Sequence, residues 1–303
     1  ELSRLGVGAV VFDAAAQPGG LNTFGVADYK MTPAFALREI DWVRQHGVEL
    51  RSGVTVGRDV SIAQIEGEFA AVFIGVGLGG IQPLGIPGED LPGVYDALDF
   101  IALLKTDRAR ARPITDGKRV AIIGGGNTAI DAVTQAARLG AAEVWMVYRR
   151  GEGDMSAYAH EIELARRAGC RFALQASPVR VVGDGKVEGI ELIRTRSEGG
   201  RAGKLELLAG TEHTLACDVV LKANGQIGHR NFLASLPGVE LSKGRPVVNE
   251  RMQTTNPRWF AGGDCVSGGK EVVNAVAEGK LAAQHIAAQL LADATDTAQK
   301  ESA

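Results

Sequence analysis

Two hydrophobic patterns alternate along the chain. Short apolar runs, typical of strands buried on both faces of a parallel sheet, occur at 9–12, at 144–148 and, after Arg119, within the expected strand 119–123. Apolar side chains instead recur at helical spacing over 130–139, and a longer helix is expected over about 271–291. This alternation of strands and helices predicts an α/β fold with doubly wound, Rossmann-like sheets.

An internal duplication is visible in the order of these elements. Arg4-Leu5-Gly6 and the strand after it match Arg138-Leu139-Gly140 and the strand after that. The run from Phe69 to Gly77 likewise matches the run from Cys217 to Gly225, since each is an apolar strand that leads into a turn of small residues. The chain therefore holds two related units, each about the length of one dinucleotide-binding domain.

The second unit carries the strongest motif, Gly124-x-Gly126-x-x-Ala129, between a strand and a helix. Gly124 permits the tight turn, Gly126 lets the backbone approach a pyrophosphate, and Ala129 allows close packing of helix on strand. The N–H groups and the positive dipole end of the helix then face the phosphates. The motif predicts a dinucleotide site, and the alternative is a plain structural turn.

Charges at the strand ends suggest which nucleotide each unit binds. The strand of the second unit ends in Arg149-Arg150, which suits a 2′-phosphate and favours NADPH over NADH, unless the pair is simply solvated. The strand of the first unit ends in Asp13, whose carboxylate suits a ribose without a 2′-phosphate, as in FAD. The following Pro18-Gly19-Gly20 makes an open turn that can pass close to a bulky ligand.

A third motif lies near the C-terminus, where Gly262-Gly263-Asp264 precedes the helix over 271–291. The aspartate can accept a hydrogen bond from a polyol, and the helix N-terminus can stabilise negative charge on a reduced flavin.

The first unit has no glycine turn of its own. In the second unit the turn begins at Gly124, a fixed number of residues before Arg138, and the position that lies the same number of residues before Arg4 would precede Glu1. We therefore expect a fragment truncated at its N-terminus; the alternative is a complete chain with a degenerate first unit.

Composition narrows the functional classes. The 303 residues carry a net charge of −3, so the composition does not indicate a nucleic-acid-binding protein. No apolar run reaches membrane-spanning length. The 40 glycines suit a backbone that approaches ligands closely. Without a signal peptide, a cytoplasmic setting is expected. Cys170, Cys217 and Cys265 form neither a C-x-x-C pair nor a metal-ligand spacing, so no redox dithiol, iron–sulfur or other metal site is predicted within this chain.

No catalytic side chain is predicted either. The histidines are scattered and form no recognisable triad: His46, His160, His213, His229 and His285. Hydride transfer from nicotinamide to flavin needs stacked rings and excluded water, because the cofactors carry the chemistry.

Taken together, these motifs resemble the FAD- and NADPH-binding part of dihydropyrimidine dehydrogenase and the related small subunit of glutamate synthase, within the pyridine nucleotide-disulfide oxidoreductase-like superfamily. The resemblance covers nearly the whole chain. The segments that carry it are 19–23, 72–78, 124–131, 148–151 and 252–264.

The resemblance implies two cofactor sites. Residues implied to contact FAD are Asp13, Gly20, Leu21, Lys30, Gly77, Gly263, Asp264, Glu271, Val272 and Val273. Residues implied to contact NAD(P)H are Gly124, Gly125, Gly126, Asn127, Thr128, Arg149, Arg150, Ala223, Asn224 and Gly225. Electrons would leave the flavin for iron–sulfur clusters in a missing segment or a partner subunit, and an oligomer is expected. The chain departs from the family where Ser156 replaces an expected further arginine.

The expected architecture places the NAD(P)H domain, 109–247, inside an FAD domain made of 1–108 and 248–303. The polar segment 107–118 is expected to be a hinge, and 196–211 a surface hairpin. The leading hypothesis is an oxidoreductase that passes a hydride from NAD(P)H to FAD. The alternatives are a non-catalytic nucleotide-binding scaffold of a larger redox complex and a stand-alone disulfide reductase, which would need a cysteine pair that this sequence lacks.

Overall fold

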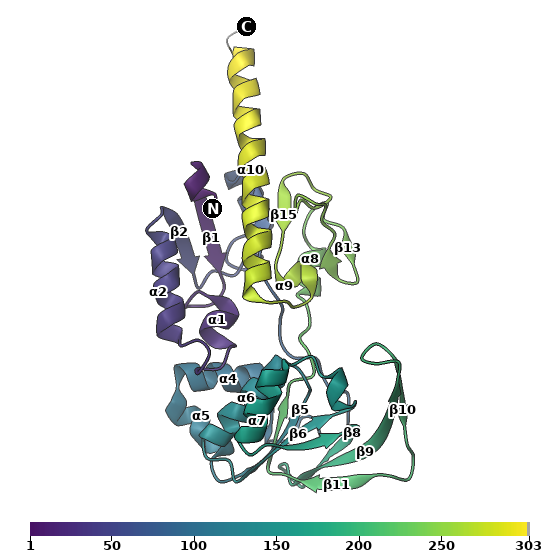
Figure 1. Ribbon diagram of the computed structural model, residues 1–303. Coiled ribbons are helices and arrows are strands. Elements are labelled where there is room, and N and C mark those ends of the chain that lie inside the picture. The colour runs from purple at the N-terminus through teal and green to yellow at the C-terminus, as the bar shows by residue number, and fades with distance from the viewer. Residues whose placement is uncertain (302–303) are drawn as a thin grey trace. The chain divides into compact units, whose positions relative to one another are not determined.

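The chain passes back and forth between two structural units in the computed structural model, which describes the backbone of residues 1–301 and the side chains of residues 1–293 (Figure 1). Unit 1 comprises Glu1–Pro18, Leu37–Gly79 and Ile227–Ala303, and unit 2 comprises Gly19–Ala36 and Gly80–Gln226. The expected α/β class, with one unit inserted into the other, is confirmed. Residues 302 and 303 of the expected FAD domain lie outside the described residues.

A five-stranded parallel sheet forms the centre of unit 2. Its strands, in spatial order, are β4 (Val94–Asp96), β12 (Val219–Lys222), β5 (Arg119–Ile123), β6 (Glu143–Tyr148) and β7 (Arg171–Leu174). Every neighbouring pair is parallel, so all five carboxyl ends lie at one edge. Residues 120–123 are buried without interruption, which is why this strand has an unbroken apolar sequence.

Both faces of this sheet are covered, one by helices and one by a second sheet (Figure 1). The helices are α4 (Ala97–Thr106), α5 (Arg108–Thr115), α6 (Asn127–Arg138) and α7 (Ala159–Arg167), with the short η2 (Glu152–Asp154) after β6. The second sheet is antiparallel and contains β8 (Ala176–Val182), β9 (Gly189–Glu198), β10 (Lys204–Leu207) and β11 (His213–Ala216).

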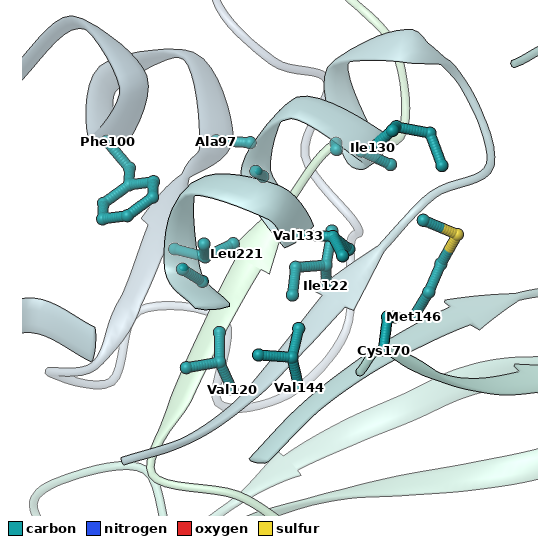
Figure 2. Close-up of a cluster of buried hydrophobic side chains, with 14 of the residues drawn as sticks. Ala97, Phe100, Val120, Ile122, Ile130, Val133, Val144, Met146, Cys170 and Leu221 are labelled. Atoms are coloured by element: carbon teal, nitrogen blue, oxygen red, sulfur yellow. The ribbon is translucent and has the colours of Figure 1, made fainter. Parts of the chain in front are cut away.

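The core of unit 2 follows the two-residue alternation of a strand. Val120 and Ile122 pack on the helical side, whereas Ala121 and Ile123 pack against the antiparallel sheet. Figure 2 shows Val133 and other helix side chains meeting the strand residues on the helical side. Each fully buried aliphatic side chain there contributes about 1.5–3 kcal/mol of transfer free energy.

Residues 19–36 belong to unit 2 because a buried lysine holds them there. The segment contains α1 (Gly20–Phe24) and the start of α2 (Pro33–Arg44). The side chain of Lys105, on α4, is 0% exposed. Its ammonium donates to the carbonyl oxygens of Val26 and Met31, both at 2.6 Å, and of Asn22 at 3.4 Å. Burial lowers the pKa of Lys105, and these carbonyls offset part of the desolvation.

A second lysine strengthens the same attachment. Lys30 Nζ lies 2.7 Å from Asp131 Oδ1, on α6, and 2.5 Å from Glu161 Oε1, on α7. Tyr29 also donates from its hydroxyl to Asp131, and the backbone N–H of Ala27 donates to the other carboxylate oxygen. The segment is therefore tied to three helices of unit 2.

Unit 1 contains two pairs of parallel strands. One pair is β1 (Ala9–Asp13) with β2 (Val48–Ser52), and the other is β3 (Val72–Ile74) with β15 (Trp259–Ala261). The remaining elements are η1 (Ser3–Leu5), most of α2, α3 (Ile62–Glu68), α8 (Arg230–Ala234), β13 (Leu241–Ser242), β14 (Arg245–Pro246), α9 (Asp264–Ser267) and α10 (Val272–Glu301). Trp259 and Ala261 pack with Leu233 and Leu236, and Phe260 packs with Ile286 of α10.

The unit boundaries differ from the expected domain boundaries for physical reasons. Residues 80–108 join unit 2, because β4 extends the parallel sheet and α4 buries Phe100 and Ile101 in its core. Residues 227–247 join unit 1, because Leu233 packs against the strands there.

The expected hinge over 107–118 is wrong, since most of it forms α5. Asp107 caps this helix by accepting a hydrogen bond from the backbone N–H of Arg110, and Ala111 is buried. The expected surface hairpin is confirmed by the antiparallel pairing of β9 with β10. Over the described residues, no helix is both long and apolar enough to span a membrane.

The ion pair between Arg119 and Asp218 gives a testable pH dependence. Hydrogen bonds from Arg119 lower the pKa of Asp218 from 3.8 to about 2, and the carboxylate is 39% exposed. Because the folded-state pKa is depressed, the pair stabilises the fold above about pH 4, and this stability is lost as the pH falls towards 2. We expect Asp218→Asn to cost about 1 kcal/mol at pH 7, allowing for solvent screening.

Urea denaturation of both proteins, followed by circular dichroism, measures this difference. It should shrink between pH 4 and pH 2. The exposed Glu212→Gln serves as the control and should leave the midpoint unchanged. A cost for Asp218→Asn that stays constant over this range would contradict the assignment.

Candidate dinucleotide-binding site

A glycine turn connects β5 to α6 at the carboxyl edge of the parallel sheet. Gly124 has φ +149°, and its N–H donates to the carbonyl oxygen of Val147 at 3.0 Å. A Cβ atom on Gly124 would lie 2.3 Å from the carbonyl oxygen of Ala223. Only glycine therefore allows the backbones that follow β5 and β12 to approach this closely.

The next two glycines differ in their surroundings. A Cβ on Gly125 would lie 2.6 Å from the ring of Tyr148, and its carbonyl oxygen accepts from the backbone N–H groups of Ser156 and Ala157. Gly126 has extended backbone (φ −104°), and its Cβ position meets only Ser156 Oγ, at 3.2 Å. Contacts with other protein groups thus fix the turn at Gly125, whereas the space beside Gly126 is open to a ligand.

The N-terminus of α6 has the features of an anion site. No side chain caps the helix, and the backbone N–H groups of Asn127 and Thr128 have no hydrogen-bond partner within the described part of the chain. Asn127 Oδ1 is buried and unpaired among the same residues, and a sugar hydroxyl can donate to it. The cradle, the free amides and the unpaired oxygen fit the pyrophosphate and ribose of a dinucleotide.

The strand-end arginines have separate environments. Arg149 is exposed, and its guanidinium has no ion pair among the described residues. Arg150 is 6% exposed and donates from Nη2 to Gly203 O (2.7 Å) and from Nε to Gly200 O (3.3 Å). Arg150 thus holds the turn between β9 and β10, and Arg149 is the cation that is left for a ligand.

The predicted turn at residues 223–225 lies beside the glycine turn. The N–H of Ala223 donates to Ile123 O at 2.8 Å, and Asn224 Nδ2 donates to Gln82 O at 2.8 Å. Gly225 has φ +112°, a conformation that favours glycine. Unit 2 therefore brings the predicted NAD(P)H residues together at one edge, with Arg150 as the exception.

In unit 1, four of the candidate FAD residues lie at or just after strand ends. The Asp13 carboxylate closes a local turn by accepting from the N–H of Ala15 at 2.9 Å. Gly77 follows β3, and Gly263 and Asp264 follow its parallel neighbour β15, so these turns share an edge. The N–H of Gly263 donates to Glu278 Oε2 at 2.6 Å.

The start of α10 has an apolar surface that suits a flat aromatic ring. Glu271 is exposed, and Val272, Val273 and Val276 are 50%, 67% and 49% exposed. The backbone N–H groups of Val272 and Val273 have no hydrogen-bond partner in the described part of the chain. Exposed valines beside free helix N–H groups fit an apolar ring system that gains negative charge when reduced.

The remaining FAD candidates, Gly20, Leu21 and Lys30, belong to unit 2. Lys30 is paired with Asp131 and Glu161, so its charge is already balanced by protein groups. Sequence reasoning missed Lys105, whose partners are carbonyl oxygens and leave no side-chain pattern. It also missed the role of the Ser156 backbone N–H, which donates to the carbonyl oxygen of Gly125. At the sequence level this position was notable only because the family resemblance implied an arginine there.

The cysteines are buried and separate. Desolvation raises the pKa of Cys170 and of Cys217 to about 12 and also raises that of Cys265, so all three stay protonated at neutral pH. Among the described residues, no three histidine, cysteine or carboxylate side chains form a metal-binding group.

These features define a class of protein, the two-unit α/β oxidoreductases that bind dinucleotides. The chain belongs to the pyridine nucleotide-disulphide oxidoreductase family, whose model matches residues 32–279. This confirms the resemblance inferred from the sequence.

Curated relatives include the glutamate synthase [NADPH] small chain of Escherichia coli (strain K12), 38% identical over 304 residues that cover 94% of this chain and 64% of the relative. The NADP(+)-dependent formate dehydrogenase subunit beta of Moorella thermoacetica is 33% identical, with 94% and 41% covered. This chain thus spans less than two thirds of the length of these relatives.

Solved structures of low sequence identity share the fold. Mycobacterium tuberculosis FprA in complex with NADPH has a TM-score of 0.77 at 20% identity and covers 96% of this chain and 79% of its own. The thioredoxin reductase of T. acidophilum has a TM-score of 0.74 at 21% identity, with 96% and 93% covered.

Gly124→Ala tests the close approach of the two turns. We expect a loss of about 2 kcal/mol or more in unfolding free energy, because the new Cβ meets the backbone at Ala223 and φ is unfavourable for alanine. The control is Gly279→Ala, a helical position with open space, which should be neutral or stabilising by up to about 1 kcal/mol. The measurement is the urea denaturation midpoint of each variant. Equal midpoints for the two variants would refute the steric constraint at Gly124.

Proposed function

We propose that this chain is the electron-input module of a flavoprotein, taking a hydride from NADPH and passing electrons through FAD to an iron–sulfur partner domain or subunit. The observation that carries the proposal is the uncapped N-terminus of α6 behind a glycine turn that cannot accept a side chain. The relatives named above support it, since their names specify NADPH or NADP(+) and a chain or subunit of a larger enzyme.

The chain would hold NADPH with unit 2. The N–H groups of Asn127 and Thr128 would bind the pyrophosphate, and Gly126 would leave space for it. Arg149 would face the adenosine ribose, where its fixed charge favours a 2′-phosphate. The turn at residues 223–225 would line the side of the NADPH site opposite the N-terminus of α6.

The chain would hold FAD with the strand-end groups of unit 1. Asp13 would accept from the adenosine ribose and Asp264 from the ribityl chain. The N-terminus of α10 would stabilise negative charge on the reduced ring, and Val272 and Val273 would pack on it. When bound, the two cofactors supply the redox chemistry: nicotinamide gives up a hydride and flavin passes the two electrons on singly.

The protein groups would bind and orient the cofactors rather than transfer protons. His160 stacks on Tyr158, and His46 hydrogen-bonds to the carbonyl oxygen of Trp42 in α2, so both rings are engaged by neighbouring groups of the protein. We also infer a cytoplasmic setting, because three buried unpaired thiols suit a reducing compartment.

Anaerobic mixing of the complete flavin-loaded chain with NADPH tests the proposal. We expect loss of the visible flavin absorbance, with NADH less effective at equal concentration. NADPH binding without bleaching by either nucleotide would refute hydride transfer and favour a non-catalytic scaffold.

Gly126→Ala separates nucleotide binding from folding. Its Cβ would occupy the space left for phosphate, while meeting only Ser156 Oγ on the protein side. We expect NADPH affinity to fall about tenfold or more, with flavin content and urea midpoint unchanged. Unchanged affinity would show that phosphate does not bind at this turn.

A further inference from the structure

The charges at the end of β6 are too few for a 2′-phosphate, if NADPH binds as proposed above. This group carries about two negative charges. Of the two arginines there, Arg149 has no ion pair among the described residues, and the guanidinium of Arg150 is committed to Gly200 and Gly203. Asp154 brings a negative charge to the same strand end, and Glu152 is neutralised by Arg166.

The β9–β10 hairpin reaches this strand end. We call residues 199–203, between the paired Glu198 and Lys204, the tip loop. Arg150 binds two carbonyl oxygens of the tip loop, at 2.7 and 3.3 Å. A Cβ on Gly200 would lie 3.7 Å from Asp154 Oδ1, so the loop lies against the segment that follows β6.

Two hydrogen bonds from strand β9 of the hairpin fix its position further. Thr195 Oγ1 donates to the carbonyl oxygen of Arg149 at 2.7 Å. Ser197 Oγ donates to Asp154 Oδ2 at 3.4 Å. The hairpin is therefore attached to the strand end at several points, and its tip cannot move away without breaking the hydrogen bonds of the buried Arg150.

Arg201 lies within the tip loop, between the two carbonyls that Arg150 binds. Its side chain is exposed and has no ion pair among the described residues. We propose that Arg201 is a specificity-determining residue that supplies the second cation for the 2′-phosphate of NADPH, beside Arg149. Arg150 acts as a positioning residue, since it holds the loop that carries Arg201.

This assignment accounts for the residue at position 156. The family resemblance implies a further arginine after Arg150, and this sequence has Ser156 there, so that positive charge is missing. Arg201 restores that charge from a different element. The tip loop that carries Arg201 lies against Asp154, so its charge would also counter that carboxylate, which would otherwise repel the phosphate.

Binding of adenosine 2′,5′-bisphosphate and of adenosine 5′-monophosphate, measured by calorimetry on the complete chain, isolates the 2′-phosphate. The two probes differ by that group alone and need no flavin. We expect Arg201→Ala to weaken bisphosphate binding about tenfold, the worth of one charge-assisted hydrogen bond. Binding of the monophosphate should stay within about twofold.

Arg196→Ala is the matched control, because it removes the same charge from the same hairpin. Arg196 pairs with Glu206 (3.4 Å) rather than facing the strand end, so the ratio of the two affinities should not change. Arg201→Lys should keep part of the ratio, since it keeps the charge but loses the bidentate geometry.

The outcomes separate this inference from the proposed function. A normal ratio in Arg201→Ala together with a reduced ratio in Arg149→Ala would overturn the role of Arg201 and leave NADPH binding intact. A wild-type chain that binds both probes equally would also overturn it, while flavin bleaching by NADH would still support hydride transfer. Failure to bind either probe would reject the proposed nucleotide site itself.

Discussion

The close approach of two backbone turns at the carboxyl edge of the parallel sheet is the constraint on which the rest of unit 2 depends. At Gly124 the chain passes so near the carbonyl oxygen of Ala223 that no side chain fits between them. This approach aligns the start of α6 with the edge of the sheet. It leaves the first N–H groups of the helix pointing away from protein partners, which makes the site suitable for phosphate.

Local patterns were sufficient to predict the strands β1, β5 and β6 and the glycine turn that follows β5. Strand β5 matches its expected bounds, because an unbroken apolar run between a charged residue and a glycine has few alternatives. The helix α5 was missed, since its polar sequence and Pro113 resemble a linker and only the cap at Asp107 and the buried Ala111 identify it.

The features that could not be predicted from the sequence depend on contacts between residues far apart in the chain. Residues 19–36 follow unit 2 because Lys105 and Lys30 bind groups far away in the chain, and no periodicity records such pairs. Arg149 and Arg150 are equivalent in sequence, yet one is exposed and the other is buried beneath a hairpin. Their different surroundings depend on β9 and β10, which pair later in the chain.

The interrupted path of unit 1 has a consequence for its synthesis. Strand β3 pairs with β15, and all of residues 80–226 lie between the two in the chain. A ribosome therefore releases the inserted unit in full before β3 can meet its neighbour. The inserted unit can fold while unit 1 is still incomplete, and the edge of β3 that pairs with β15 stays unprotected until residues 259–261 have left the ribosome, an interval in which an unpaired strand edge favours aggregation.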